Sequence, residues 1–406
     1  MTTAVPLPDL AAPRLDALRS LVSDPAAFRD KLPDTPGLHS TGGDFRALLD
    51  VTDVEELLTS RSLRRPAFRL IRDGKQVPDA ECLGERLLYP DVADPRKVAG
   101  LLRAGATLVL QALQELHAPC GDFARRLAHD LGRPINVNAY LTPAGAQGFA
   151  DHYDVQDSFI VQVRGTKDWT LYEPVLRDPL SSETFDRVRA RVGGTVVPEG
   201  AAPWREVTLR PGDCLWLPRG WVHSARSTDT DSLHLTISLY EWTGWWALSC
   251  ALERTAELPG RFPVSADFFR DPSAAARDLA RVRTELVTWL QEVDDAALAE
   301  SVRTAALKEF PPALRHPVLT ATAQAPGATA AYRVHPQAVL SAGRVGERIV
   351  LHLADRVLTV PAPLEELLRD VLSRDRFTPA DLPDHPHRDL LLTRLVADGV
   401  LEPTKS

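Results

Sequence analysis

The stretch from Pro134 to about Trp246 constrains the fold most, because it consists of short apolar runs separated by glycine, proline and aspartate. Each run has the length of a single strand: INVNAYLTP, SFIVQVRG, DWTLYEP, EVTLRPGD, CLWLPRG and HLTISLYEW. Regular short strands with turn residues between them are typical of an antiparallel sandwich or barrel. We therefore expect a β-sheet core in this part of the chain.

Helical patterns lie on both sides of this region. From about Leu15 to Gly132 the pattern is mainly helical, for example in residues 97–116, where apolar residues recur at intervals near 3.6. A second apolar stripe runs from Leu279 to Val293 and must bury against a partner. The sequence thus predicts an α+β protein with an N-terminal mainly helical region (1–133) packing on the core (134–250), followed by a helical region (251–325).

The last part of the chain, residues 326–406, reads as a separate small unit. A stretch rich in proline, alanine and glycine at 320–332 resembles a linker. Two strands at 346–355 and 356–362 and two helices at 363–373 and 387–398 are compatible with a winged-helix module. Residues 331–406 contain ten Lys and Arg against eleven Asp and Glu, so we expect this unit to contact protein and not nucleic acid.

Charge and cysteine content narrow the class of protein further. The net charge of −8 argues against a phosphate backbone as the main partner. The cysteines Cys82, Cys120, Cys214 and Cys250 show no C-x-x-C spacing, which argues against a structural zinc site or a disulfide framework. The N-terminus lacks the features of a signal peptide, and no apolar run approaches the length of a membrane span. We expect a cytoplasmic protein without membrane contact.

His152-Tyr153-Asp154, together with His223, forms a candidate metal site. Two histidines and one carboxylate on one face of an octahedral metal leave three positions open, as non-haem Fe(II) oxygenases require. The triplet alone has little weight, because His387-Arg388-Asp389 has the same spacing but opens a helical pattern. His152 and Asp154 instead lie at the entrance to a strand, where both side chains project to the same face.

The run around His223 is more specific than the triplet. Gly212, Pro218 and Gly220 give a turn, a strand and a second tight turn that presents His223. This spacing is that of a second cupin-type motif, and the triplet lies 71 residues before it. The competing interpretation, in which His223 caps a turn and Asp154 starts a strand, remains open at this point.

The residues that carry these motifs also resemble a known family. The segments NVNAYLTPAGAQGFADHYDVQDSFIVQVRGTKDWTLYEP, PGDCLWLPRGWVHSA and SLHLTISLYEW strongly resemble the JmjC ribosomal oxygenases, or cupin-4 family, over about 64–246. The resemblance implies a JmjC/cupin double-stranded β-helix, or jelly-roll, core. It also implies that residues 251–325 form a helical dimerisation region and that residues 326–406 form a C-terminal winged-helix-like domain, although no sharp motif marks either region.

The same resemblance assigns roles to individual residues. His152, Asp154 and His223 take the places of the family's iron(II) ligands and thus of its catalytic centre. Lys167, thirteen residues after Asp154, falls where the family pairs a lysine with the distal carboxylate of 2-oxoglutarate. Three further residues match positions that line the co-substrate pocket: Asn138, Tyr140 and Thr236.

The expected activity is that of an Fe(II)- and 2-oxoglutarate-dependent oxygenase, which uses dioxygen to hydroxylate a side chain in a protein or peptide. The resemblance points to histidine or arginine side chains, with a ribosomal protein among the candidate substrates. An N-methyl demethylase with the same metal chemistry and a non-catalytic cupin-like binding module are the alternatives. The apolar stripe from Leu279 to Val293 predicts a homodimer.

Overall fold

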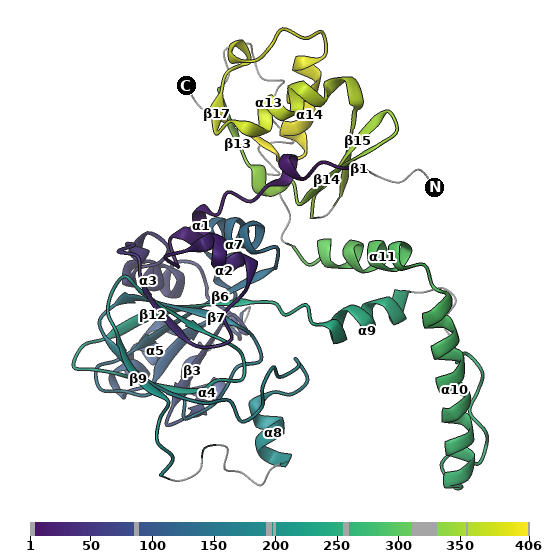
Figure 1. The fold of residues 1–406 in the computed structure, drawn as a ribbon. Coiled ribbons are helices and arrows are strands. Elements are labelled where there is room, and N and C mark those ends of the chain that lie inside the picture. The colour runs from purple at the N-terminus through teal and green to yellow at the C-terminus, as the bar shows by residue number, and fades with distance from the viewer. Residues whose placement is uncertain are drawn as a thin grey trace. The chain divides into compact units, whose positions relative to one another are not determined.

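The computed structural model describes residues 5–84, 89–191, 197, 200–254, 260–310, 331–354 and 356–404. It divides into two compact units (Figure 1). The larger unit comprises Ala11–Glu241, and the smaller one combines Met1–Leu10 with Trp242–Ser406. The predicted linker at 320–332 lies outside the described residues except for its last two positions, which begin a strand.

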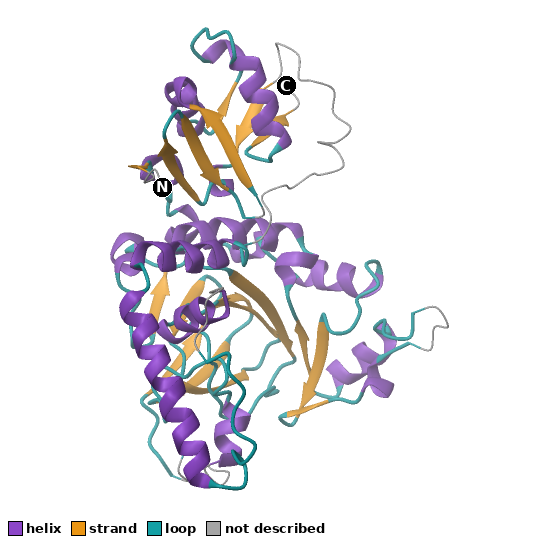
Figure 2. Ribbon diagram, turned by 90° about the vertical axis from the view of Figure 1, so that its right-hand side faces the viewer, coloured by secondary structure: helices purple, strands orange, loops and turns teal. Residues whose placement is uncertain are grey.

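Two antiparallel sheets form the core of the larger unit (Figure 2). The first has eight strands in the order β2-β10-β7-β12-β6-β5-β3-β4, and the second has three in the order β11-β8-β9. The eight strands are β2 (Gly37–Ser40), β3 (Phe68–Arg72), β4 (Lys75–Gln76), β5 (Thr107–Leu110), β6 (Ile135–Thr142), β7 (Ser158–Arg164), β10 (Asp213–Leu217) and β12 (Ser232–Leu239). The three strands of the small sheet are β8 (Lys167–Tyr172), β9 (Arg205–Leu209) and β11 (Val222–Ser227).

An apolar core joins the two sheets. Ile160 of the large sheet and Trp169 and Leu171 of the small sheet belong to one cluster of buried side chains. Each of the six apolar runs of the sequence overlaps one of the observed strands, so the predicted antiparallel β-core is confirmed.

Helices of the larger unit precede or interrupt these strands. They are α1 (Asp16–Arg19), α2 (Pro25–Asp30), α3 (Val51–Thr59), α4 (Asp79–Cys82), α5 (Pro95–Arg103), α6 (Leu113–Leu116), α7 (Ala118–Leu131) and α8 (Phe185–Arg191), with a 3-10 turn at Phe45–Ala47. Asp130 in α7 is buried, and its carboxylate accepts hydrogen bonds from the backbone N–H groups of Leu15, Ala17 and Leu18. The α1 segment is thereby fixed to α7.

The prediction of a single helix over residues 97–116 is wrong. Helix α5 ends at Arg103, and Gly105 follows with a φ of +86° that an α-helix does not allow. Strand β5 then pairs with both β3 and β6, and all four of its residues are buried. Burial in the middle of a sheet therefore outweighed the helical periodicity to which Leu108 and Val109 contributed. The N-terminal region also supplies β2, β3 and β4, which its helical pattern did not indicate.

Among its described residues, the smaller unit contains five helices and two short sheets. The helices α9 (Gly244–Arg254), α10 (Pro272–Glu292) and α11 (Asp295–Leu307) come first in the chain. One sheet has the order β1-β14-β15-β16: Val5–Pro6, Ser341–Val345, Arg348–His352 and Val357–Pro361. The other has the order β17-β13-β18: Arg376–Phe377, Ala331–Val334 and Leu401–Thr404.

The last helices of the chain are α13 (Glu365–Ser373) and α14 (Arg388–Ala397), with 3-10 turns at Pro8–Ala11, Pro336–Ala338, Ala362–Leu364 and Pro379–Asp381 elsewhere in this unit. The strands predicted at 346–355 and 356–362 and the helices predicted near 363–373 and 387–398 are therefore present. Winged-helix character and dimerisation stay predictions. Within the described ranges, no helix is both long enough and apolar enough to cross a membrane.

Candidate active site

The structure brings His152, Asp154 and His223 together. His223 is the second residue of β11, and its backbone N–H donates to the carbonyl of His152 at 2.7 Å, while the return bond measures 3.0 Å. One potential ligand atom from each of the three residues lies within 4.8 Å of the others. Asp154 itself lies in the loop before β7 and not in a strand, so its proximity to His223 comes from this bridge and not from a shared strand face.

Both histidines are oriented by a backbone carbonyl. Nδ1 of His152 lies 2.8 Å from the carbonyl oxygen of Ala150, and Nδ1 of His223 lies 3.0 Å from that of Trp221. A carbonyl oxygen can only accept, so each Nδ1 carries a proton and Nε2 is the ring nitrogen available to a metal. Histidine ligands of metals are oriented in this way by their surroundings.

The surroundings of His223 favour the neutral form that a metal ligand needs. Burial, followed by the nearby His152, lowers the pKa of His223 to about 4, although the carboxylate of Asp154 opposes the shift. The Nε2 atom of His223 lies 3.8 Å from a carboxylate oxygen of Asp154. The donor set of two imidazoles and one carboxylate suits a divalent transition metal such as iron(II).

A tight turn places His223 at the start of β11. Gly220 has a φ of +82°, and a Cβ at this position would lie 2.4 Å from the carbonyl oxygen of Leu176. The N–H of Gly220 donates to the backbone oxygen of Asp154 at 2.9 Å, and the N–H of Arg219 donates to the carboxylate of Asp157 at 2.8 Å. The turn therefore binds the segment that contains Asp154, which connects the two halves of the motif.

Lys167 begins β8 and points into the space between the sheets, where it is 4% exposed. Its Nζ donates to Thr142 Oγ1 at 3.1 Å and lies 3.4 Å from Nδ1 of His234. Burial lowers the pKa of Lys167 to about 7, and no ion pair among the described residues includes it. A buried amine without a carboxylate partner fits an anionic ligand such as the distal carboxylate of 2-oxoglutarate.

The predicted pocket residues Asn138, Tyr140 and Thr236 share one face of the large sheet. Thr236 lies opposite Asn138, and His234 lies opposite Tyr140, in the β6–β12 pair. Burial raises the pKa of Tyr140 to about 12, so its hydroxyl stays protonated and can donate. The amide oxygen of Asn138 accepts from the N–H of Ala112 at 3.1 Å, so this side chain also fixes the turn between β5 and α6.

Three residues of this region were not assigned from the sequence. Thr142 and His234 continue the i, i+2 alternation of Tyr140 and Thr236, so the alternation itself could have indicated them. Trp169 lies between His223 and His234, with ring centroid distances of 5.9 and 5.5 Å. No sequence pattern distinguishes Trp169 from an ordinary core aromatic residue.

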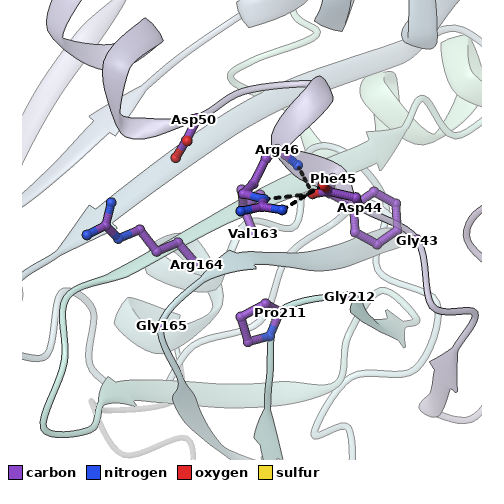
Figure 3. A pocket seen from close by; sticks show the side chains of 10 residues that line it. All are labelled: Gly43, Asp44, Phe45, Arg46, Asp50, Val163, Arg164, Gly165, Pro211 and Gly212. Carbon is purple, nitrogen blue, oxygen red and sulfur yellow. Dashed lines mark hydrogen bonds and ion pairs between the residues drawn. The ribbon is translucent and has the colours of Figure 1, made fainter.

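A separate hollow of about 520 Å³ lies beside the turn between β7 and β8 (Figure 3). The Arg46 side chain is paired there with Asp44, at 2.9 and 2.8 Å. None of the residues that line it is among the seven predicted site residues: Gly43, Asp44, Phe45, Arg46, Asp50, Val163, Arg164, Gly165, Pro211 and Gly212. The hollow is therefore not part of the candidate active site.

Comparison with known proteins agrees with this geometry. The family model of the JmjC domain matches residues 122–245. Ribosomal oxygenase 1 of Homo sapiens is 35% identical over 209 residues, which cover 50% of this chain and 30% of that protein. The bifunctional lysine-specific demethylase and histidyl-hydroxylase NO66 of Dictyostelium discoideum is 44% identical over 116 residues, covering 27% of this chain and 21% of that protein. The chain spans less than a third of the length of these curated relatives.

Solved structures show the same fold over most of the chain. The structure of YcfD from Escherichia coli aligns with a TM-score of 0.52 and 15% identity, covering 95% of this chain and 99% of that one. A second structure of YcfD, described as a ribosomal oxygenase in complex with cobalt and succinic acid, aligns over the same shares with a TM-score of 0.51 and 16% identity. The predicted cupin-type core is confirmed by this likeness. Residues 122–245 thus match the JmjC domain, and the chain has the fold of the YcfD structures.

Proposed function

We propose that this protein is an Fe(II)- and 2-oxoglutarate-dependent dioxygenase that hydroxylates a side chain in a protein or peptide. One observation carries the proposal: two histidines and a carboxylate converge near the start of β11, and the neighbouring strand β8 contributes a buried amine without a carboxylate partner among the described residues. The first group suits iron(II), and the second suits an anionic co-substrate.

Each site residue has a definite part in this reaction. His152, Asp154 and His223 would hold the metal and leave three positions for a bidentate co-substrate and dioxygen. Lys167 and Thr142 would bind the distal carboxylate, and the protonated hydroxyl of Tyr140 can donate toward the same ligand. Asn138 and Thr236 would line the pocket. When bound, iron, 2-oxoglutarate and dioxygen supply an oxidant that replaces a C–H hydrogen with a hydroxyl group.

A polypeptide substrate is favoured by the relatives. Their names describe ribosomal oxygenases and a histidyl-hydroxylase, which supports histidine as a target. Arginine is a second possible target, because the sequence resemblance to the JmjC ribosomal oxygenases points to either side chain. The net charge of −8 favours a basic partner such as a ribosomal protein over nucleic acid. We place the reaction in the cytoplasm, because Cys82, Cys120 and Cys214 are buried thiols outside any disulfide.

N-methyl demethylation is the second candidate, because the relative from Dictyostelium is also named a lysine-specific demethylase. It would use the same metal site on a methyl group and would release formaldehyde. A non-catalytic cupin-like module is disfavoured, since such a module has no need for both the metal ligands and a buried lysine.

Mass spectrometry of reaction products tests the proposal. The purified protein is incubated with iron(II), 2-oxoglutarate and basic ribosomal proteins, and the products are fragmented. We expect succinate together with one added oxygen on a single side chain. Formaldehyde with loss of a methyl mass would support demethylation, and turnover with free amino acids alone would contradict both candidates.

A further inference from the structure

His234 contacts residues of both sheets around the proposed co-substrate pocket. It lies in the middle of the large sheet, on β12 between β6 and β7, and is 3% exposed. Its ring stacks on Tyr140 at 4.7 Å with an interplanar angle of 4°, and it meets Trp169 edge-on at 5.5 Å and 83°. The ring is therefore held in one orientation by two aromatic neighbours.

This orientation directs Nδ1 of His234 toward Lys167. The two nitrogens are 3.4 Å apart, and an ammonium group can only donate, so when Lys167 is charged Nδ1 accepts and the ring proton is on Nε2. Thr142 Oγ1 is the other acceptor of Lys167, at 3.1 Å. Thr142 is fixed in turn, because it also receives a hydrogen bond from Thr107 at 3.2 Å.

Two of the three hydrogens of the Lys167 ammonium are thus directed to protein acceptors. The third is left for a ligand, and its direction follows from the other two. The same ring also supports Tyr140 by stacking, so one side chain determines how the lysine and the tyrosine lie relative to each other.

We infer that His234 is a positioning residue that sets where the pocket binds the distal carboxylate, and thereby which length of 2-oxo dicarboxylate it accepts. This inference rests on the proposed function. A histidine that only filled space would be replaced without consequence by another side chain of similar volume. A positioning histidine requires an acceptor at Nδ1, because without it one Lys167 hydrogen loses its partner and the amine can move.

The test compares two replacements of His234. His234→Gln keeps an oxygen that can accept from Lys167, whereas His234→Leu keeps apolar volume and removes the acceptor. Ser238→Ala serves as the matched control, since Ser238 is on the same strand and bonds Ser158 at 2.9 Å. Titration calorimetry without oxygen measures binding of 2-oxoglutarate and of the longer 2-oxoadipate to the manganese-loaded protein, and steady-state assays measure kcat and KM for 2-oxoglutarate.

We expect His234→Leu to weaken 2-oxoglutarate binding at least about tenfold, with manganese affinity unchanged and kcat changed much less than KM. Its preference for 2-oxoglutarate over 2-oxoadipate should shrink, whereas His234→Gln should recover most of both properties. The Ser238→Ala protein should match the wild type. If His234→Leu does not fold, His234→Gln is compared with the wild type alone. Retained 2-oxoglutarate binding and selectivity then support the inference, and loss of both in the folded variant overturns it.

Unchanged affinity and unchanged selectivity in His234→Leu would overturn the inference and leave the proposed function standing. The same holds if a folded His234→Gln loses binding and selectivity as fully as His234→Leu does. A wild-type protein that binds manganese but neither 2-oxo acid would instead refute the proposed function, and the inference with it.

Discussion

At the scale of single residues, the candidate site depends on which atoms are left free. The carbonyls of Ala150 and Trp221 fix a proton of His152 and of His223 on Nδ1, so that Nε2 of each ring is the nitrogen available to a metal. The ligand types could be predicted from the spacing of the two motifs. The alternation of polar residues could indicate Thr142 and His234 as pocket residues, but it could not predict that both contact Lys167, because these contacts form only when the two sheets pack.

Removing one metal ligand should abolish turnover without unfolding the protein. We expect His152→Ala and Asp154→Ala to lose bound iron and iron-dependent 2-oxoglutarate consumption, because each removes one of only three protein ligands. Metal content, thermal unfolding and succinate production measure this. His387→Ala is the control, since His387 has the same triplet spacing but lies at the start of α14, and it should behave like the wild type. Turnover near the wild-type level in either site variant would disprove the ligand assignment.

Lys167 should make co-substrate binding depend on pH. Its pKa of about 7 means that the ammonium form is lost as the pH rises through 7, and the anionic carboxylate prefers the charged form. We therefore expect the Kd for 2-oxoglutarate to increase between about pH 6.5 and 8.5. Lys167→Ala should raise the Kd across this window and remove the trend, while iron binding is retained. A Kd that rises with pH equally in both proteins would show that another group is responsible.

At the scale of elements, the turn between β10 and β11 holds His223 close to Asp154 in the candidate metal site. It presents His223 and binds the backbone of Asp154 through the N–H of Gly220. The alternating strands of residues 134–239 could be predicted from their period and turn residues. Strand β5 could not, because Thr107–Leu110 becomes a strand through pairing with β3 and β6, which are distant in sequence. Local periodicity does not contain that information.

Gly220→Ala should destabilise the protein and weaken metal binding together. A Cβ at this position adds the strain of a positive φ and a clash with the carbonyl oxygen of Leu176. Gly105→Ala is the matched control, because Gly105 has a φ of +86° but nothing within 4 Å of an added Cβ. We expect Gly105→Ala to cost about 1 kcal/mol in free energy of unfolding and Gly220→Ala roughly 2 kcal/mol more. Equal losses in urea unfolding would mean that the contact with Leu176 is unimportant.

At the scale of the whole molecule, the smaller unit has an exposed apolar helix face. Helix α10 of the smaller unit exposes 58% of Leu279 and 43% of Leu290, although both belong to the apolar stripe of the sequence. The stripe predicted that this face requires a partner, and no part of the described chain fully covers it. The sequence pattern does not identify the partner that covers this face, so the homodimer stays a prediction.

We expect a homodimer that the exposed face of α10 stabilises. Leu279→Asp combined with Leu290→Asp should shift the protein toward the monomer, because burying two carboxylates at an interface is unfavourable. Light scattering over a range of concentrations measures the mass. Val357→Asp is the control, since Val357 is 54% exposed on β16 of the same unit but outside the stripe. A wild-type protein that is monomeric at every concentration would contradict the prediction.

The most direct test of the central claim is the origin of the oxygen in the product. The wild-type protein is supplied with iron(II), 2-oxoglutarate, a basic ribosomal protein substrate and dioxygen labelled with the heavy isotope, and the modified peptide is sequenced by mass spectrometry. The proposed dioxygenase predicts one heavy oxygen on a single side chain and none in the Asp154→Ala reaction. Oxygen derived from water, or a labelled product that forms equally in the Asp154→Ala reaction, would contradict it.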